Sequence, residues 1–105
     1  MTDTGALPQS QLQTLLIDQM YRLLDTRTYP KTICPSEIAR AMPAAQLSEV
    51  GVTNWRELMT PIRAIAWDAR ANGHLEIMQR GRPLSDDARL EDISGPIRLR
   101  RIPHD

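Results

Sequence analysis

The chain has 105 residues, of which 41% are hydrophobic and 25% are charged, as is ordinary for one soluble globular domain with a single modest core. Lysine plus arginine equals aspartate plus glutamate at thirteen each, so the formal net charge is zero. A neutral total weighs against a strongly nonspecific nucleic-acid binder, which usually carries excess positive charge.

The N-terminal part of the chain predicts a tail followed by a long helix. Residues 1–8 are polar and end in proline, which predicts a disordered tail before a single domain over residues 9–103. Ser10 is placed to cap a helix that runs to about Asp25. Apolar residues recur along it at helical spacing: Leu12, Leu15, Leu16, Met20, Leu23 and Leu24. The helix is expected to serve packing.

A short strand and a second helix are predicted next. Residues 32–34 are β-prone, and a strand here is expected to pair with a later hairpin. With Cys34 as N-cap, Pro35 takes the first helical position and Glu37 the third, as in a capping box. This pattern predicts a helix over residues 35–42.

Residues 43–53 form the next segment and are interpreted as a loose connection, because they combine proline, glycine and small side chains. Asn54 followed by Glu57 is a second capping-box pattern, which predicts one or two helical turns over residues 55–59. These turns are either a separate helix or the beginning of the next one.

The next predicted helix, over residues 61–72, is central to the chain. Thr60 is a suitable N-cap and Pro61 suits the first helical position. One apolar face is predicted from Ile62, Ile65, Ala66 and Ala69. The opposite face carries Arg63, Trp67 and Arg70.

A β-hairpin is predicted after this helix. Asn72-Gly73 terminates the helix, and residues 75–79 alternate as in a strand. Gly81 supplies a position free to take positive φ, between Arg80 and Arg82.

A long loop separates this turn from a return strand. Residues 83–95 include four acidic residues, Asp86, Asp87, Glu91 and Asp92. The return strand then has an apolar face of Ile97 and Leu99 and a basic face of Arg98 and Arg100.

The order of these elements is helix, short strand, two helices, strand, wing and strand. This order predicts an α+β, mostly α fold of the winged helix-turn-helix type, with three main helices, a small antiparallel sheet and a wing.

Three stretches carry a resemblance to a known family: KTICPSEIAR (31–40), the WRELM-to-GHLEI region (55–77) with QRGRP (79–83), and GPIRLRR (95–101). Together they resemble a small bacterial family catalogued as a domain of unknown function, number three-two-five-three. The resemblance implies a winged-helix fold and brings no activity, ligand or catalytic residue. This chain has a longer connection before Trp55 and a longer, more acidic loop between Arg82 and Gly95.

The basic residues favour a winged-helix DNA-binding protein, with a function in transcriptional regulation. Residues 61–72 would be the recognition helix, and turn 80–82 would begin the wing and lie against the backbone. The predicted nucleic-acid-binding residues are Arg63, Trp67, Arg70, Arg80, Arg82, Arg98 and Arg100. The expected partner is double-stranded DNA, bound by one chain or a dimer.

An alternative function uses the same fold without nucleic acid. The arginines of the turn and of the return strand would then pair with the acidic loop, and the helix face would be solvated. Trp67 reads more naturally as an anchor for a protein partner or a second copy than as a reader of a groove. The alternative is therefore a protein–protein interaction module.

Catalysis has little support in the sequence. Cys34 is placed at a helix N-terminus, where its thiol is either reactive or a small buried side chain. His74 follows the helix-ending glycine, with no partner that suggests acid–base chemistry. No metal or cofactor is expected, since a lone cysteine cannot build a structural zinc site. No signal peptide or membrane-spanning run is seen, and a cytoplasmic location is expected.

Overall fold

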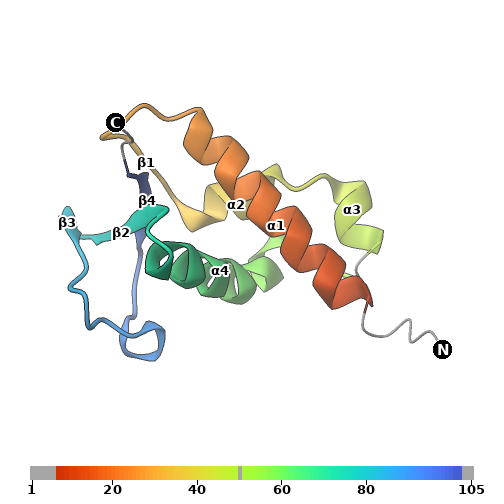
Figure 1. Cartoon of the computed structure of the whole chain (residues 1–105). Helices are drawn as coiled ribbons and strands as arrows, with labels where there is room; N and C mark the ends of the chain where they lie inside the picture. The colour runs from red at the N-terminus through yellow and green to blue at the C-terminus, as the bar shows by residue number, and fades with distance from the viewer. Residues whose placement is uncertain (1–6, 50, 103–105) are drawn as a thin grey trace.

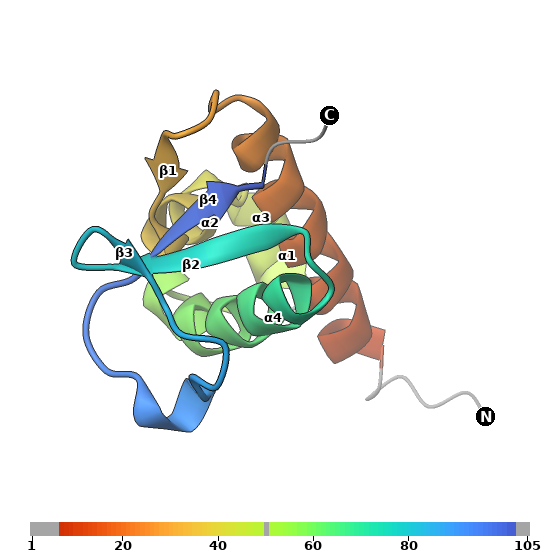
Figure 2. The same ribbon diagram turned by 60° about the vertical axis from the view of Figure 1, so that its left-hand side comes forward.

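Helices lie behind one face of a four-stranded antiparallel sheet in a computed structural model, which describes residues 7–49 and 51–102 (Figure 1; Figure 2). The elements in chain order are α1 (Leu7–Asp25), β1 (Thr32–Ile33), α2 (Pro35–Ala41), α3 (Ala44–Glu49), the 3-10 helix η1 (Trp55–Leu58), α4 (Met59–Ala71), β2 (Leu75–Gln79), β3 (Arg82–Pro83), the 3-10 helix η2 (Leu90–Asp92) and β4 (Arg98–Arg101). The α+β class is confirmed.

Helix α1 begins earlier than the sequence predicted. It starts at Leu7, so the prediction of a tail over residues 1–8 is wrong for its last two residues, and Ser10 is not the cap. Pro8 is tolerated because a proline in the first helical turn loses no intrahelical hydrogen bond. Residues 1–6 of that tail, and residue 103 of the predicted domain, lie outside the described residues.

One cluster of buried apolar side chains joins α1, α2 and α4 to the sheet. From α1 it takes Leu16, Met20 and Leu24. From α4 it takes the face that the sequence predicted, Ile62, Ile65, Ala66 and Ala69. Such burial is the main stabilising contribution in a domain of this size.

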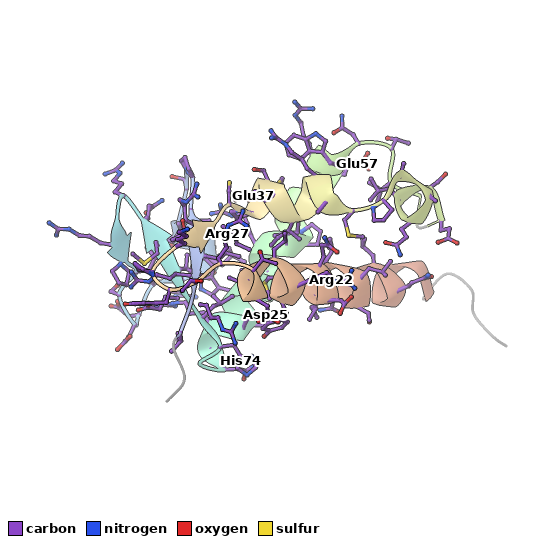
Figure 3. The ribbon with its side chains drawn as sticks, turned by 90° about the horizontal axis from the view of Figure 1, so that it is seen from above. Arg22, Asp25, Arg27, Glu37, Glu57 and His74 are labelled. Carbon is purple, nitrogen blue, oxygen red and sulfur yellow. The ribbon has the colours of Figure 1, made fainter. Side chains whose placement is uncertain are left out.

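Helix α2 begins as predicted. The Cys34 N–H donates to Glu37 Oε2 at 2.7 Å, which satisfies one of the donors that the helix start leaves open. The other carboxylate oxygen of Glu37 pairs with Arg27 at 2.5 Å, so this residue also ties α2 to the turn after α1 (Figure 3). The helix ends at Ala41, which is exposed, and the following C-cap residue Met42 is buried in the core.

Helix α3 was not predicted, since residues 43–53 were interpreted as a loose connection. The N–H groups of Gln46 and Leu47 donate to the Pro43 carbonyl oxygen at 3.0 and 3.1 Å, so Pro43 starts the helix. None of its residues is buried, and Leu47 is its one side chain packed against the core. A helix with a single inward apolar residue has no periodicity to detect.

Helix α4 starts two residues earlier than predicted. Asn54 caps η1 as expected, accepting the Arg56 N–H at 2.9 Å. However, η1 runs directly into α4 at Met59, so Thr60 is inside the helix and is not its cap. Pro61 is the third residue of α4, where the missing N–H is tolerated in the first turn.

Glu57 holds the start of η1 by accepting three hydrogen bonds. They come from Thr53 Oγ1 at 2.8 Å, Thr53 N–H at 3.2 Å and Asn54 N–H at 3.0 Å. These bonds, the Thr53 hydroxyl first, hold the pKa of the Glu57 carboxyl below its ordinary value of 4.5.

Glu57→Gln is therefore expected to flatten the acid side of the stability profile. A folded-state pKa below the unfolded one adds stability above the unfolded pKa, and this is lost as pH falls through the folded pKa. The melting temperature, followed by circular dichroism between about pH 6 and 3, should fall less steeply in the variant than in wild type. Glu49→Gln, at the exposed end of α3, is the control and should keep the wild-type slope.

Helix α4 ends at the predicted Asn72-Gly73 signal. The His74 N–H donates to the Ala69 carbonyl at 2.9 Å, and the Gly73 N–H to the Arg70 carbonyl at 3.0 Å, which is a Schellman motif. Gly73 has φ of +79°, the left-handed conformation that the motif requires. The chain therefore turns directly from α4 into β2.

The sheet has the order β1-β4-β2-β3, and every pair is antiparallel. β2 matches the predicted strand at both ends, and β1 pairs with the return strand β4, as expected of a short strand after α1. In register, Leu99 of β4 lies between Ile33 of β1 and Ile77 of β2. All three side chains are fully buried, so the centre of the sheet is also the centre of the core.

Candidate nucleic-acid interface

One side of α4 carries Arg63, Trp67 and Arg70, as the spacing predicted, and all three are half-buried. They are half-buried because the long segment between β3 and β4, here called loop 84–97, packs beside this helix. In Figure 2 the loop descends from β3, passes alongside α4 and returns to β4. The predicted recognition face is therefore a contact surface within the chain.

The two α4 guanidiniums hold this loop by its backbone. Arg63 donates to the carbonyl oxygens of Ile93 at 3.1 Å and Gly95 at 3.4 Å. Arg70 donates to the carbonyl of Ser85 and, at 3.4 Å, to that of Leu84. Arg70 therefore holds the start of the loop and Arg63 holds its end. Hydrogen bonds from a charged donor are stronger than neutral ones.

Gln79 adds a third attachment from the sheet. Its Nε2 donates to the carbonyl oxygens of Ser94 at 2.9 Å and Pro96 at 3.4 Å. The loop is thus bound through its main chain, which carries no charge. Its acidic side chains are not what attaches it to α4.

Trp67 lies between the helix and the start of the loop. It packs against the core cluster, and the Arg70 guanidinium is 5.8 Å from its ring centroid. A hollow of about 430 Å³ opens beside these two side chains, with Asp86 and Ala88 of the loop on its other side. Trp67 is therefore half-buried in a recess with an acidic residue on its wall.

The β2–β3 turn places Arg80 and Arg82 at an exposed tip. Arg80 has φ of +54° and Gly81 of +80°, so both central residues are left-handed, as in a type I′ turn. Gly81 takes this conformation as predicted, while Arg80 takes it at some steric cost. Within residues 7–49 and 51–102, neither arginine side chain makes a hydrogen bond or ion pair, so both guanidiniums are open to solvent.

On the outer face of the sheet, Arg98 and Arg100 have different surroundings. Arg98 Nε donates to Thr32 Oγ1 at 2.6 Å and the side chain remains exposed. Arg100 is largely buried: two of its nitrogens contact Glu76 Oε1 at 2.7 and 2.9 Å, and it stacks over the Tyr29 ring at 4.9 Å. The Arg100 guanidinium is therefore bound by Glu76, whereas most N–H donors of Arg98 make no hydrogen bond within the described residues.

The expected pairing of these arginines with the acidic loop is not what the structure contains. Within the described part of loop 84–97, the guanidinium of Arg89 pairs with the carboxylate of Glu91, two residues later, at 3.0 Å. The partner of Arg100 is Glu76, directly opposite it across β2 and β4. The cross-strand register would have suggested Glu76 as the partner of Arg100, since oppositely charged residues that face each other across two strands attract.

The other candidate residues are placed as follows. Cys34 is half-buried at the N-cap of α2 and accepts from Ser36 Oγ at 3.1 Å. The Tyr21 hydroxyl lies 2.6 Å from His74 Nδ1, and burial raises the pKa of the Tyr21 phenol. Among the described residues, no three His, Cys, Asp or Glu side chains are grouped so as to hold a metal ion.

Comparison with protein families gives a match over most of the chain. The family model described as "Protein of unknown function (DUF3253)" matches residues 13–102. No curated protein matches the chain significantly. Within the described part of the chain, no helix combines the length and apolar character needed to cross a membrane.

Proposed function

The chain belongs to the DUF3253 family of unknown function, and we propose that it is a winged-helix DNA-binding protein that holds the duplex mainly through the wing. Here the wing is the β2–β3 turn together with loop 84–97. The recognition helix is α4, which starts two residues earlier than predicted, and α3 and η1 lie between α2 and α4.

The observation that carries the proposal is the pair of open guanidiniums at the turn. Arg80 and Arg82 flank Gly81 at the exposed tip of the β2–β3 turn, and Arg98 is exposed on β4. Arginine is suited to phosphate oxygens because its planar fork donates two parallel hydrogen bonds. Such residues position a protein on the DNA backbone.

Helix α4 has a smaller role in this proposal than the sequence suggested. Arg63 and Arg70 already donate to loop carbonyls, so base contacts by them require the loop to move away. The side chains that α4 leaves exposed are Thr60, Ala64, Asp68 and Ala71, which offer little for reading a major groove. The binding is therefore expected to be dominated by the backbone, with modest sequence preference.

The salt dependence of DNA binding tests the proposal. Wild type should bind mixed-sequence duplex DNA in a fluorescence anisotropy titration at low salt and lose affinity as salt rises. The double variant Arg80→Gln/Arg82→Gln should bind about tenfold or more weakly and lower the log–log salt slope by about 2, since each phosphate contact contributes about 0.9.

The control for this titration is Arg22→Gln, which removes an exposed arginine paired with Asp18 on α1. It should leave both affinity and slope unchanged. A double variant with the wild-type slope would place the DNA contacts away from the turn. Absence of binding at the lowest salt would remove the DNA function altogether.

A second function, protein interaction without nucleic acid, is favoured by the recess at Trp67. A half-buried tryptophan beside an arginine is a common anchor at interfaces. Asp86 on the far wall would repel a phosphate and suit a basic or apolar side chain of a partner. Binding of DNA with the salt behaviour given above would decide against this alternative.

A further inference from the structure

We propose that the hollow between α2, α3 and η1 is a binding site for a small organic carboxylate with an apolar body, centred on Arg40, Trp55 and Arg56. Figure 1 shows α3 and the β2–β3 turn at opposite ends of the molecule, so this site is remote from the wing. The inference does not depend on the proposed DNA binding.

The charged part of the site consists of two guanidiniums over one indole. The central guanidinium carbon of Arg40 lies 4.8 Å from the Trp55 ring centroid, and that of Arg56 lies 4.7 Å from it. Both are within cation–π distance, so two positive charges from different elements lie against one ring. Two positive charges beside one half-buried ring favour an anionic ligand by charge complementarity.

Neither guanidinium is neutralised by the chain itself. Within the residues that the structure describes, Arg40 and Arg56 make no ion pair and donate no side-chain hydrogen bond. Glu57 follows Arg56 in sequence, but its carboxylate accepts from Thr53 and Asn54. The positive charge is therefore available to a ligand.

The apolar part of the site is the wall of the hollow. Its volume is about 410 Å³, within the range of small-molecule pockets, and its lining includes Ala39, Met42 and Leu47. Ala39 and Met42 are buried members of the core, whereas Leu47 is half-buried and keeps accessible apolar surface. An acyl or ring body would cover the accessible apolar surface of Leu47 and Trp55, which an inorganic anion would leave wet.

Trp55 provides a direct readout of occupancy. The chain has two tryptophans, so Trp67→Phe leaves Trp55 as the one indole in the molecule. Cyclohexanecarboxylate, added to this variant, should change Trp55 fluorescence saturably and bind more tightly than acetate. The neutral cyclohexanecarboxamide and inorganic phosphate should each bind at least about tenfold more weakly. Calorimetry on the wild-type protein should give the same ranking without any substitution.

Variants of the two arginines complete the test. Arg40→Gln and Arg56→Gln should each weaken cyclohexanecarboxylate about tenfold, while Arg22→Gln should have no effect. Equal affinity for the carboxamide would show that charge plays no part and would overturn the proposal. Equal affinity for phosphate would overturn it in favour of a phosphate site. No saturable binding up to about 10 mM would also overturn it.

Discussion

Leu99→Ala is expected to lower the free energy of unfolding by about 3 kcal/mol, because alanine in place of a buried leucine leaves a cavity. Leu99 is fully buried on β4, which is hydrogen-bonded to β1 on one side and to β2 on the other. Ile33 and Ile77 flank it in register, and both belong to short, paired strands that cannot easily move inward. For a domain of this size the loss is a large fraction of the roughly 5–15 kcal/mol available.

Urea denaturation followed by circular dichroism measures this effect. The midpoint should fall while the slope with urea stays near that of wild type, as for a change in stability alone. Leu90→Ala, the same substitution at a half-buried position in η2, is the matched control and should cost less than about 1 kcal/mol. Equal midpoints for the two variants would contradict the central position assigned to Leu99.

The double variant Arg63→Gln/Arg70→Gln is expected to release loop 84–97 from α4. The variant loses the charged donors to the carbonyls of Ile93, Gly95 and the loop's first residues. We expect the free energy of loop opening to fall by roughly 1.5 kcal/mol, which is about a tenfold larger open population. The sheet and the core should be unaffected.

Limited trypsin cleavage after Arg89, followed by mass spectrometry, measures the opening. Arg89 is exposed in the loop, and its cleavage rate should rise about tenfold when opening precedes cleavage. Arg22→Gln again serves as the control.

The double variant Arg63→Gln/Arg70→Gln also separates two roles in DNA binding. Unchanged DNA affinity agrees with a structural role for the two arginines. A fall in affinity as large as that of the turn variant would make them DNA contacts.

The sequence predicted those parts of the fold whose causes are local. The end of α4 at Asn72-Gly73 and the limits of β2 follow from a glycine that can take positive φ and from alternation of apolar residues. The Glu37 and Glu57 caps were likewise visible, because a capping box involves only four consecutive residues.

The parts that failed depend on contacts between distant residues. Helix α3 is supported by one side chain, Leu47, against a core built from other elements. Threonine is a residue type that often caps helices, which is why Thr60 was predicted as the cap. However, Leu58 packs into the core and η1 continues into α4 without a break. Propensity at a single position does not outweigh such burial.

The candidate site shows the same division. Spacing placed Arg63, Trp67 and Arg70 on one side of α4, as observed. It gave no information on the partners of the two arginines, because these are backbone carbonyls 14 to 32 residues away, and any residue offers a carbonyl. Charge counting suggested that the acidic loop would pair with the arginines of the turn and return strand, whereas Arg63, Arg70 and Gln79 hold the loop by its backbone carbonyls.

The two outermost strands of the sheet limit the backbone that is open to pairing with another strand. β1 and β3 are the edges, and each is only two residues long. β3 ends at Pro83, which cannot donate a hydrogen bond to an incoming strand, and Pro35 follows closely after β1. Short edges with proline are a known defence against strand addition and aggregation. The described sheet therefore offers little edge backbone to which another strand could add.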